Sequence, residues 1–165
     1  TLAFQIAMVR RSLAISERVP VAPVERSRAV AERLLAVATR FDEGPSATVH
    51  GSFKLSHVLA TTRGIAFIDF DGANSGDPTF DLGRFVAHVL KMAAMGKITP
   101  DTADETIRNF NSAYRRAARI PLAQERIDWA TAAHLVSGGL DKSVKRMDRR
   151  AMEALVAVAD KLCPS

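Results

Sequence analysis

Apolar residues recur every three or four positions along most of this chain, the spacing that places them on one face of a helix. The first forty residues are predicted to form two helices, separated by Pro20 and Pro23. The buried stripe of the second helix is expected at Val30, Leu34, Val37 and Phe41. The segment 42–47, DEGPSA, is typical of a connector.

Four further helices are predicted in the second half of the chain. The first begins at Asp77-Pro78, because Asp can cap exposed amides of a first turn and Pro fits its backbone geometry. The second begins at Thr99-Pro100-Asp101, the third runs from near Pro121 to Gly138-Gly139, and the last covers roughly Asp148 to Leu162. The inward faces are expected at Leu82, Phe85, Val86, Val89 and Leu90, at Ala103, Ile107, Phe110 and Tyr114, and at Met152, Leu155, Val156 and Ala159.

A β pattern interrupts the helices between residues 48 and 69. Thr48 and Val49 predict a short strand, and two apolar runs around Thr61–Gly64 predict a β-hairpin in which Gly64 can take a positive φ. The hairpin ends at Asp69, so a strand would hold that carboxylate in place. The chain is therefore expected to have an α+β fold that is mostly helical, with one small β element.

The candidate chemistry lies beside this β element. The motif HGSFKLSH, residues 50–57, follows the short strand, and IDFDG, residues 68–72, ends the hairpin. Polar groups of the two segments are expected to converge. This layout suits phosphoryl transfer, in which a catalytic loop and a metal-binding Asp meet at a triphosphate.

The segment 50–82 resembles the catalytic core of the aminoglycoside phosphotransferase and choline kinase-like family, distant relatives of protein kinases. That family carries HGD, a variable stretch and Asn, then an apolar residue with Asp-Phe or Asp-Trp, then GDP and a DL pair. The matching pieces here are His50-Gly51, Ile68-Asp69-Phe70, Gly76-Asp77-Pro78 and Asp81-Leu82. Several pieces in order are more specific than a single short motif.

The resemblance covers roughly residues 25–160 and implies a kinase-like C-terminal lobe. Residues 1–165 are expected to form one domain. No glycine-rich loop or strand-rich segment precedes Thr48. This chain is therefore expected to be either a piece of a longer chain, with the N-terminal lobe that covers the nucleotide in cis, or a reduced relative.

The resemblance also implies roles for individual residues. Asp69 matches the family's metal-binding carboxylate and would hold Mg²⁺ with ATP or GTP, and Asp71 is a candidate second carboxylate. Lys54 lies where protein kinases often have a lysine that touches the transferred phosphate, which makes it a candidate catalytic and cofactor-binding residue. Ser52 replaces the family's catalytic Asp, where the substrate hydroxyl approaches. His57 replaces the metal-binding Asn, and Mg²⁺ prefers oxygen ligands to imidazole.

Each of these residues also has a structural interpretation. Asp69 and Asp71 could accept hydrogen bonds within turns, and Lys54 could face solvent. Ser52 could be a loop residue that remains after loss of the base, because its hydroxyl needs an activating partner near neutral pH. A pair formed by Ser52 and His57 is a further hypothesis, which requires suitable geometry and a third, orienting group.

Four other residues near the motifs are interpreted as structural. His50 is expected to pack beneath the loop, and Asp81 is expected to brace it. His88 and His134 have no ligand partner three or four positions away, so both are interpreted as packing or surface residues.

Composition excludes some classes of protein. A single cysteine, Cys163, excludes an internal disulfide and a cysteine-based metal cluster, and it agrees with a reducing cytoplasm. No apolar run is long enough for a membrane span, and Arg10 and Arg11 follow the first apolar residues, unlike the charges of a signal peptide.

The net charge of +5 favours anionic ligands. Two basic groups contribute to it. One is Arg115, Arg116 and Arg119, and the other is Lys142, Lys145, Arg146, Arg149 and Arg150. A basic face argues against an aminoglycoside substrate and suits an anionic one, although solvated helix faces would explain the same residues.

Three functions are compatible with these features. The first is transfer of phosphate from ATP or GTP to the hydroxyl of a small molecule by the full-length protein. The second is a degenerate kinase-like module that binds a nucleotide or a partner without catalysis. The third, a basic helical protein that binds nucleic acid, lacks interleaved aromatic residues and a helix-turn-helix signal.

Overall fold

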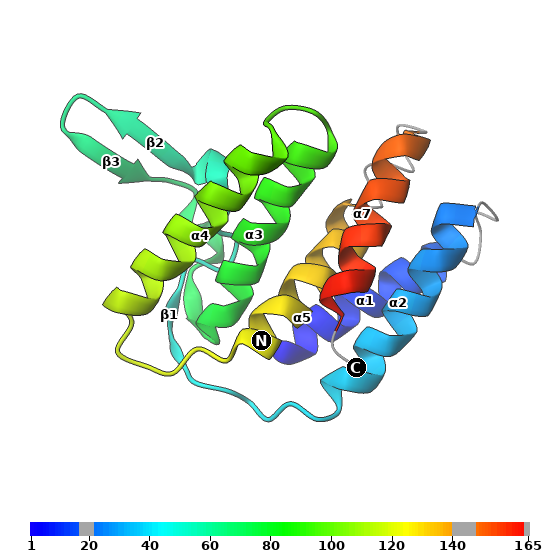
Figure 1. Ribbon diagram of the computed structural model, residues 1–165. Helices are drawn as coiled ribbons and strands as arrows, with labels where there is room; N and C mark the ends of the chain where they lie inside the picture. The colour runs from blue at the N-terminus through cyan, green and yellow to red at the C-terminus, as the bar shows by residue number, and fades with distance from the viewer. Residues whose placement is uncertain (17–21, 140–147, 164–165) are drawn as a thin grey trace.

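The computed structural model describes residues 1–16, 22–139 and 148–163. Its helices are α1 (Leu2–Ser16), α2 (Ala22–Ala38), α3 (Pro78–Ala94), α4 (Pro100–Ala117), α5 (Gln124–His134) and α7 (Arg149–Leu162), and a π-helical turn, η3 (Leu135–Gly139), follows α5. Helix α5 contacts α1, α2, α3 and α7, whereas α4 packs against α3 on the side away from the other helices (Figure 1). The mostly helical fold predicted from the periodicity is therefore confirmed.

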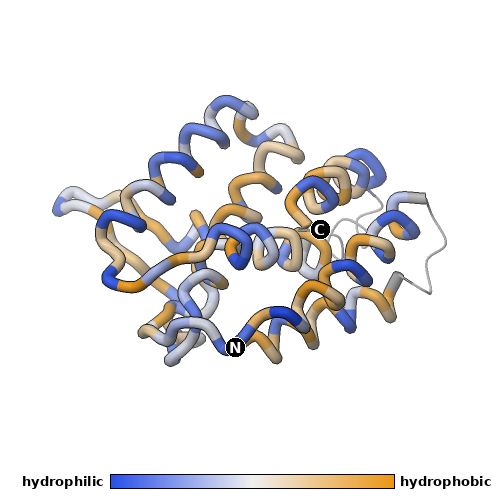
Figure 2. The backbone as a smooth tube through the Cα atoms, turned by 60° about the horizontal axis from the view of Figure 1, so that its bottom comes forward, coloured by the Kyte–Doolittle hydropathy of each residue, from blue (hydrophilic) through white to orange (hydrophobic). Residues whose placement is uncertain are grey.

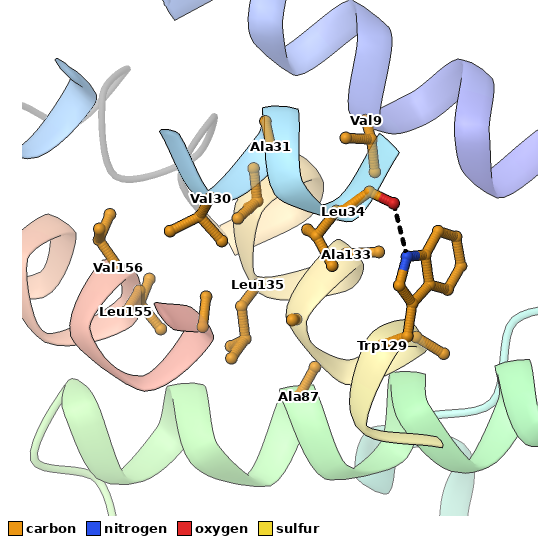
Figure 3. Close-up of a cluster of buried hydrophobic side chains, with 14 of the residues drawn as sticks. Val9, Val30, Ala31, Leu34, Ala87, Trp129, Ala133, Leu135, Leu155 and Val156 are labelled. Carbon is orange, nitrogen blue, oxygen red and sulfur yellow. Dashed lines mark hydrogen bonds between the residues drawn. The ribbon is translucent and has the colours of Figure 1, made fainter. Parts of the chain in front are cut away.

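The main core lies where α2, α3, α5 and α7 meet around a buried tryptophan. Trp129 is fully buried and its indole Nε1 donates a hydrogen bond to the carbonyl oxygen of Leu34, 2.9 Å away (Figure 3). Val30 and Leu34 are buried in this core, as the predicted stripe of α2 requires, whereas Phe41 lies beyond the end of α2 and packs edge-on against the indole. Figure 2 shows hydrophobic and hydrophilic residues interspersed along the helices, as expected for helices with one buried and one exposed face.

Helix α3 is fixed at its start by a buried ion pair. Asp77 caps the helix by accepting a hydrogen bond from the amide of Thr79, and Pro78 occupies the first turn. The other carboxylate oxygen of Asp77 lies 2.7 Å from Nη2 of Arg126 on α5. Removing one member of such a buried ion pair is costly, because the other charge then stays buried without a partner. The first turn of α3, which also carries Asp81, is thereby held in one position relative to α5.

The starts of the other helices largely follow their capping residues. Thr99 caps α4 and Asp148 caps α7, as expected. Pro23 lies inside the first turn of α2, which corrects its predicted role as a separator of helices, and Pro20 lies outside the described residues. The helix predicted from Pro121 begins only at Gln124, because residues 118–123 form an extended connection.

Two small antiparallel sheets lie on one side of the helices. Strands β2 (Val58–Thr61) and β3 (Gly64–Phe67) form the predicted hairpin, which extends away from the body in Figure 1. Strand β1 (Ala47–Val49) pairs with β4 (Asn74–Gly76), which was not predicted. The β1–β4 pairing brings the segments on either side of the hairpin together. Short 3₁₀ turns, η1 (Leu55–His57) and η2 (Phe70–Gly72), precede β2 and follow β3.

Candidate active site

The loop that begins at His50 is held by the carboxylate of Asp81. One oxygen, Oδ2, accepts hydrogen bonds from the amides of His50 at 2.7 Å and Gly51 at 3.1 Å, and Oδ1 accepts one from the amide of Phe53 at 3.2 Å. Because Asp81 lies in the first turn of α3, the loop is attached directly to the helical body. The predicted role of Asp81 as a brace is confirmed.

A close backbone contact brings the two motif segments together. Gly51 has a φ of +75°, and a Cβ at this position would lie 2.0 Å from the carbonyl oxygen of Gly72. Only glycine permits both the positive φ and this approach. Gly51 therefore allows the HGS segment to cross the IDFDG segment at van der Waals distance.

His50 links the two segments through its ring. Its Nε2 lies 2.9 Å from the carbonyl oxygen of Ile68, and the ring stacks on Phe70 with centroids 4.7 Å apart. A carbonyl only accepts hydrogen bonds, so Nε2 is the donor, and in the neutral tautomer this leaves Nδ1 as an acceptor. Ser52 Oγ lies 3.4 Å from this Nδ1, at the long limit for a hydrogen bond. The predicted packing of His50 beneath the loop is thus confirmed, and His50 is the histidine that contacts Ser52.

Asp69 lies beside the same loop in an unusual backbone conformation. Its φ of 68° and ψ of 52° place it in the left-handed region, where no other non-glycine residue of the described ranges is found. Asp tolerates this region better than most residues, yet such conformations concentrate at functional sites. Its side chain is 47% exposed, so the carboxylate is accessible to a ligand.

His57 contacts Asp69 directly. Its Nε2 lies 3.0 Å from Oδ2 of Asp69, and the imidazole is almost fully buried. Burial is the main cause that lowers the pKa of His57, and the positive charge of Lys54 lowers it further. At neutral pH the contact is therefore a hydrogen bond from a neutral ring and not an ion pair. It occupies one carboxylate oxygen of Asp69 and leaves the other available.

Aromatic packing ties the loop to α3 and α4. Phe53 stacks on Phe85, with ring centroids 5.5 Å apart, and on Phe110, at 5.7 Å. Phe85 is buried, and Phe110 packs in the same cluster. The side chains on either side of Phe53, Ser52 and Lys54, are half-buried at the surface of this cluster.

The other predicted site residues lie in less definite positions. Lys54 precedes η1 and lines a cavity with Arg84, which the sequence interpretation did not select. Asp71 is exposed in η2. Within the part of the chain that the structure describes, no three His, Cys, Asp or Glu side chains converge as a metal site. Asp69 and His57 are thus brought together, without Asp71 as a third member of a cluster.

The predicted basic groups are mainly engaged with their own surroundings. Arg115 donates hydrogen bonds to the carbonyl of Leu122 and to Gln124, and Arg149 bonds Glu153 one turn along α7. Lys142, Lys145 and Arg146 lie outside the described residues. A third basic group was overlooked. Arg84, His88 and Lys91 recur at a spacing of four and three on α3, a pattern that could have revealed it.

The sequence places this chain in a known family. A profile of the Phosphotransferase enzyme family matches residues 4–121, and the chain belongs to that family. No protein with a curated description matches the chain significantly.

Two solved structures of glucosamine kinase have the same fold. One is described as crystal form B, with 22% sequence identity and a TM-score of 0.75. The other is a complex with glucosamine, ADP and inorganic phosphate, with 22% identity and a TM-score of 0.74. The alignments cover 99% and 98% of this chain but only 46% and 47% of those chains, so this chain spans about half of their length.

Proposed function

We propose that this chain is the C-terminal lobe of a small-molecule kinase, which in its full-length form transfers phosphate from ATP or GTP to a substrate hydroxyl. The carrying observation is the contact between His57 and Asp69, 3.0 Å apart, beside the loop that Asp81 holds. Phosphoryl transfer depends mainly on positioned charges and little on covalent chemistry by the protein. A fixed, half-exposed carboxylate next to a braced loop meets that requirement. Membership of the phosphotransferase family supports the same reaction class.

The donor set fits Mg²⁺ only as part of a nucleotide complex. Mg²⁺ commonly takes one or two carboxylates and completes its shell with phosphate oxygens and water. Asp69 offers one such oxygen, since His57 is hydrogen-bonded to the other. Asp69 would therefore hold the ion, and the ion would neutralise charge on the phosphates. His57 fits better as the group that orients Asp69 than as a ligand.

An exposed apolar surface next to Asp69 supports the proposed N-terminal lobe. Six large hydrophobic side chains are exposed in the described residues, and five of them lie between residues 59 and 70: Leu59, Ile65, Phe67, Ile68 and Phe70. Ile65 and Phe67 share one face of the hairpin and Leu59 lies on the other, because Ile65 pairs with Ala60 and Phe67 with Val58. Exposed apolar residues gathered in one segment are typical of binding surfaces. In the proposed full-length protein this surface is covered by the nucleotide and by the lobe that corresponds to the remaining half of the glucosamine kinase chains.

Ser52 is proposed to lie where the substrate hydroxyl approaches. Its own hydroxyl is a weak base, but Nδ1 of His50 is an acceptor at 3.4 Å, and the carbonyl of Ile68 keeps the ring in the required tautomer. A proton from the substrate could pass through Ser52 to His50 once the contact shortens in the bound complex. Lys54, two residues further along the loop, is proposed to touch the transferred phosphate.

A kinase-like module without catalysis is the second candidate. The observation in its favour is that two positions of the catalytic motif, Ser52 and His57, carry residues other than the family's Asp and Asn. Family membership favours nucleotide over nucleic acid as the ligand.

In the described residues no helix is long and apolar enough to cross a membrane. We place the protein in the cytoplasm, where the free thiol of Cys163 would stay reduced.

Nucleotide binding provides the first test. A ligand that binds only the folded state raises the melting temperature. The full gene product should melt at a higher temperature with ATP or GTP plus Mg²⁺, and Asp69→Asn should remove this increase. Asp101→Asn is the matched control, because it removes the same charge at an exposed residue of α4, outside the motif segments. An increase that persists in Asp69→Asn, or none in the unaltered protein, would reject the proposal.

Ser52→Asp separates the two candidates. The change restores the base of the family motif, and general base catalysis contributes on the order of 10²–10⁴-fold. We expect phosphate transfer by the full-length protein to rise or stay unchanged. If the protein is inactive because Ser52 replaces the catalytic Asp, the Ser52→Asp variant should gain phosphate transfer. A loss of measured transfer would show that a carboxylate cannot replace the proposed proton path through the Ser52 hydroxyl to His50.

A further inference from the structure

A small cavity with a basic lining lies next to the catalytic loop. It has a volume of about 140 Å³, is open to solvent, and is lined by residues of α1, the loop at Lys54, α3, α5 and η3. The polar side chains of its lining are Lys54, Arg84, His88, Lys91 and His134, and its other lining residues are Met8, Ala87, Leu135 and Gly138. Every ionisable group in the described lining is therefore basic. Such a cavity can hold several non-hydrogen atoms, since a water molecule occupies about 30 Å³ of liquid.

Helix α3 supplies most of this charge. Arg84, His88 and Lys91 are separated by four and three positions, so they follow one another along a single face of the helix. The guanidinium of Arg84 makes no hydrogen bond or ion pair with the described residues. Asp81, the nearest acidic residue on the same helix, already accepts three backbone hydrogen bonds from the catalytic loop. Arg84 therefore keeps its donors for a ligand.

Partial burial destabilises the charged guanidinium of Arg84 when no anion is bound beside it. Desolvation is the main cause that lowers the pKa of Arg84, and the charges of Asp81 and Asp69 only partly oppose it. Buried charges are normally paired. His134 is neutral near neutral pH and adds no positive charge to the cavity, because burial and the charge of Arg84 lower its pKa to about 3. Its Nε2, without a partner in the described structure, can accept a hydrogen bond from a hydroxyl of the ligand.

We propose that this cavity binds an anionic group of the acceptor substrate, a phosphate or a carboxylate, through Arg84, Lys54 and Lys91. The inference rests on the proposed function, and it names the substrate class as small hydroxylated anions. Lys54 and Ser52 are two residues apart, which is at most about 7 Å along the chain. One molecule of the size of a sugar phosphate or a hydroxy acid can thus place its anion in the cavity and its hydroxyl at Ser52. A cationic amine such as that of glucosamine would be repelled by this lining.

Inorganic phosphate and acetate are the probes for the site. Titration calorimetry on the 165-residue chain should show binding of at least one of them, weakened tenfold or more in Arg84→Met and largely restored in Arg84→Lys. Arg63→Met is the matched control, because Arg63 is an exposed arginine at the hairpin turn, outside the cavity lining, and its loss should change affinity less than twofold. Equal affinity in Arg84→Met, or no binding by either probe, would overturn the site.

A second variant tests the cavity without removing Arg84. A side chain at Gly138 would meet open space, so Gly138→Asp adds a carboxylate to the lining with little strain. It should weaken phosphate binding, whereas Gly138→Asn should weaken it much less, and an equal effect of both would overturn the charge argument. Phosphate binding should also persist when the full gene product is saturated with ATP and Mg²⁺, since displacement would assign the cavity to the nucleotide. If the protein binds the anion but its melting temperature does not respond to nucleotide, the proposed kinase function is rejected and the anion site is retained. If it responds to nucleotide but does not bind the anion, only the anion site is rejected.

Discussion

The helical body and the motif layer, residues 47–76, are stabilised in different ways. The body buries a large apolar core around Trp129, and its buried Asp77 is paired with Arg126. The motif layer has few buried residues, and Ile65 at its hairpin is 70% exposed. It is attached to the body by Asp81, by the packing of Phe53 and by the contact of Gly51 with Gly72.

This difference separates stability from function within one chain. The body is held together by its own buried contacts, so changes there should alter the free energy of unfolding. The motif layer carries the candidate chemistry and presents an apolar surface that the chain itself does not cover. Changes there should alter binding and local order and leave the unfolding of the body almost unchanged.

Trp129→Ala should have the largest effect on stability. It removes a fully buried indole together with its hydrogen bond to Leu34, and such truncations cost about 3–5 kcal/mol. Chemical denaturation followed by circular dichroism measures the loss. A cost below about 1 kcal/mol would show that the core is less tightly packed than the structure indicates.

His134 should make the body sensitive to acid. The pKa of its buried ring is lowered to about 3, against an ordinary value of 6.5, so the unfolded chain binds the proton more readily. This residue's contribution is fully present above pH 6.5 and is lost as the pH falls from 6.5 toward 3. Between pH 7 and 5 it should cost about 2 kcal/mol. Denaturation at both pH values should show a smaller pH dependence in His134→Leu, and an unchanged dependence would contradict the assignment.

Asp81→Ala tests the attachment of the loop to the body. Three amides lose their acceptor, which should lower the free energy of unfolding by roughly 1–2 kcal/mol. The amides of His50, Gly51 and Phe53 should exchange hydrogen faster, whereas those of α5 should not. Asp101→Ala, an exposed first-turn residue of α4, is the control. Equal exchange in the loop before and after the change would exclude Asp81 as its main support.

Ile65→Thr should have the smallest effect. The side chain is exposed on the hairpin, so its loss should change the free energy of unfolding by less than about 0.5 kcal/mol. If the proposed N-terminal lobe covers the hairpin, the same change in the full gene product should cost more than it does in the 165-residue chain. Denaturation of both proteins makes the comparison, and equal small costs would place Ile65 outside that contact.

Local rules were sufficient for the helices and for the hairpin. Asp77 and Thr99 cap their helices because capping depends on a few adjacent residues, and Leu34 and Phe85 are buried because periodicity selects the inward face. The motif resemblance correctly indicated that Asp81 supports the loop. It also anticipated that Asp69 lies beside the 50–57 loop, where Asp69 contacts His57.

Features that depend on distant residues were not predictable in the same way. Strand β4 is too short to carry a pattern and exists because it meets β1. The partner of Ser52 is His50 instead of His57, because the crossing of Gly51 and Gly72 sets the loop's path. The spacing of Arg84, His88 and Lys91 could have revealed a basic face of α3, but the cavity beside it requires the loop, α3 and α5 to meet. The roles of Lys54, Asp71 and Ser52 remain predictions.

The central claim is that phosphate transfer needs both this lobe and the proposed N-terminal lobe, and single-turnover phosphate transfer tests it most directly. Labelled ATP or GTP is mixed with a panel of hydroxyl compounds and with either the 165-residue chain or the full gene product. Because half of the charge arrangement around the phosphates is proposed to lie in the N-terminal lobe, the chain alone should transfer no phosphate. The full product should transfer it, and Asp69→Ala should abolish the transfer. Transfer by the chain alone that Asp69→Ala removes, or transfer by the full product that survives Asp69→Ala, would contradict the proposal.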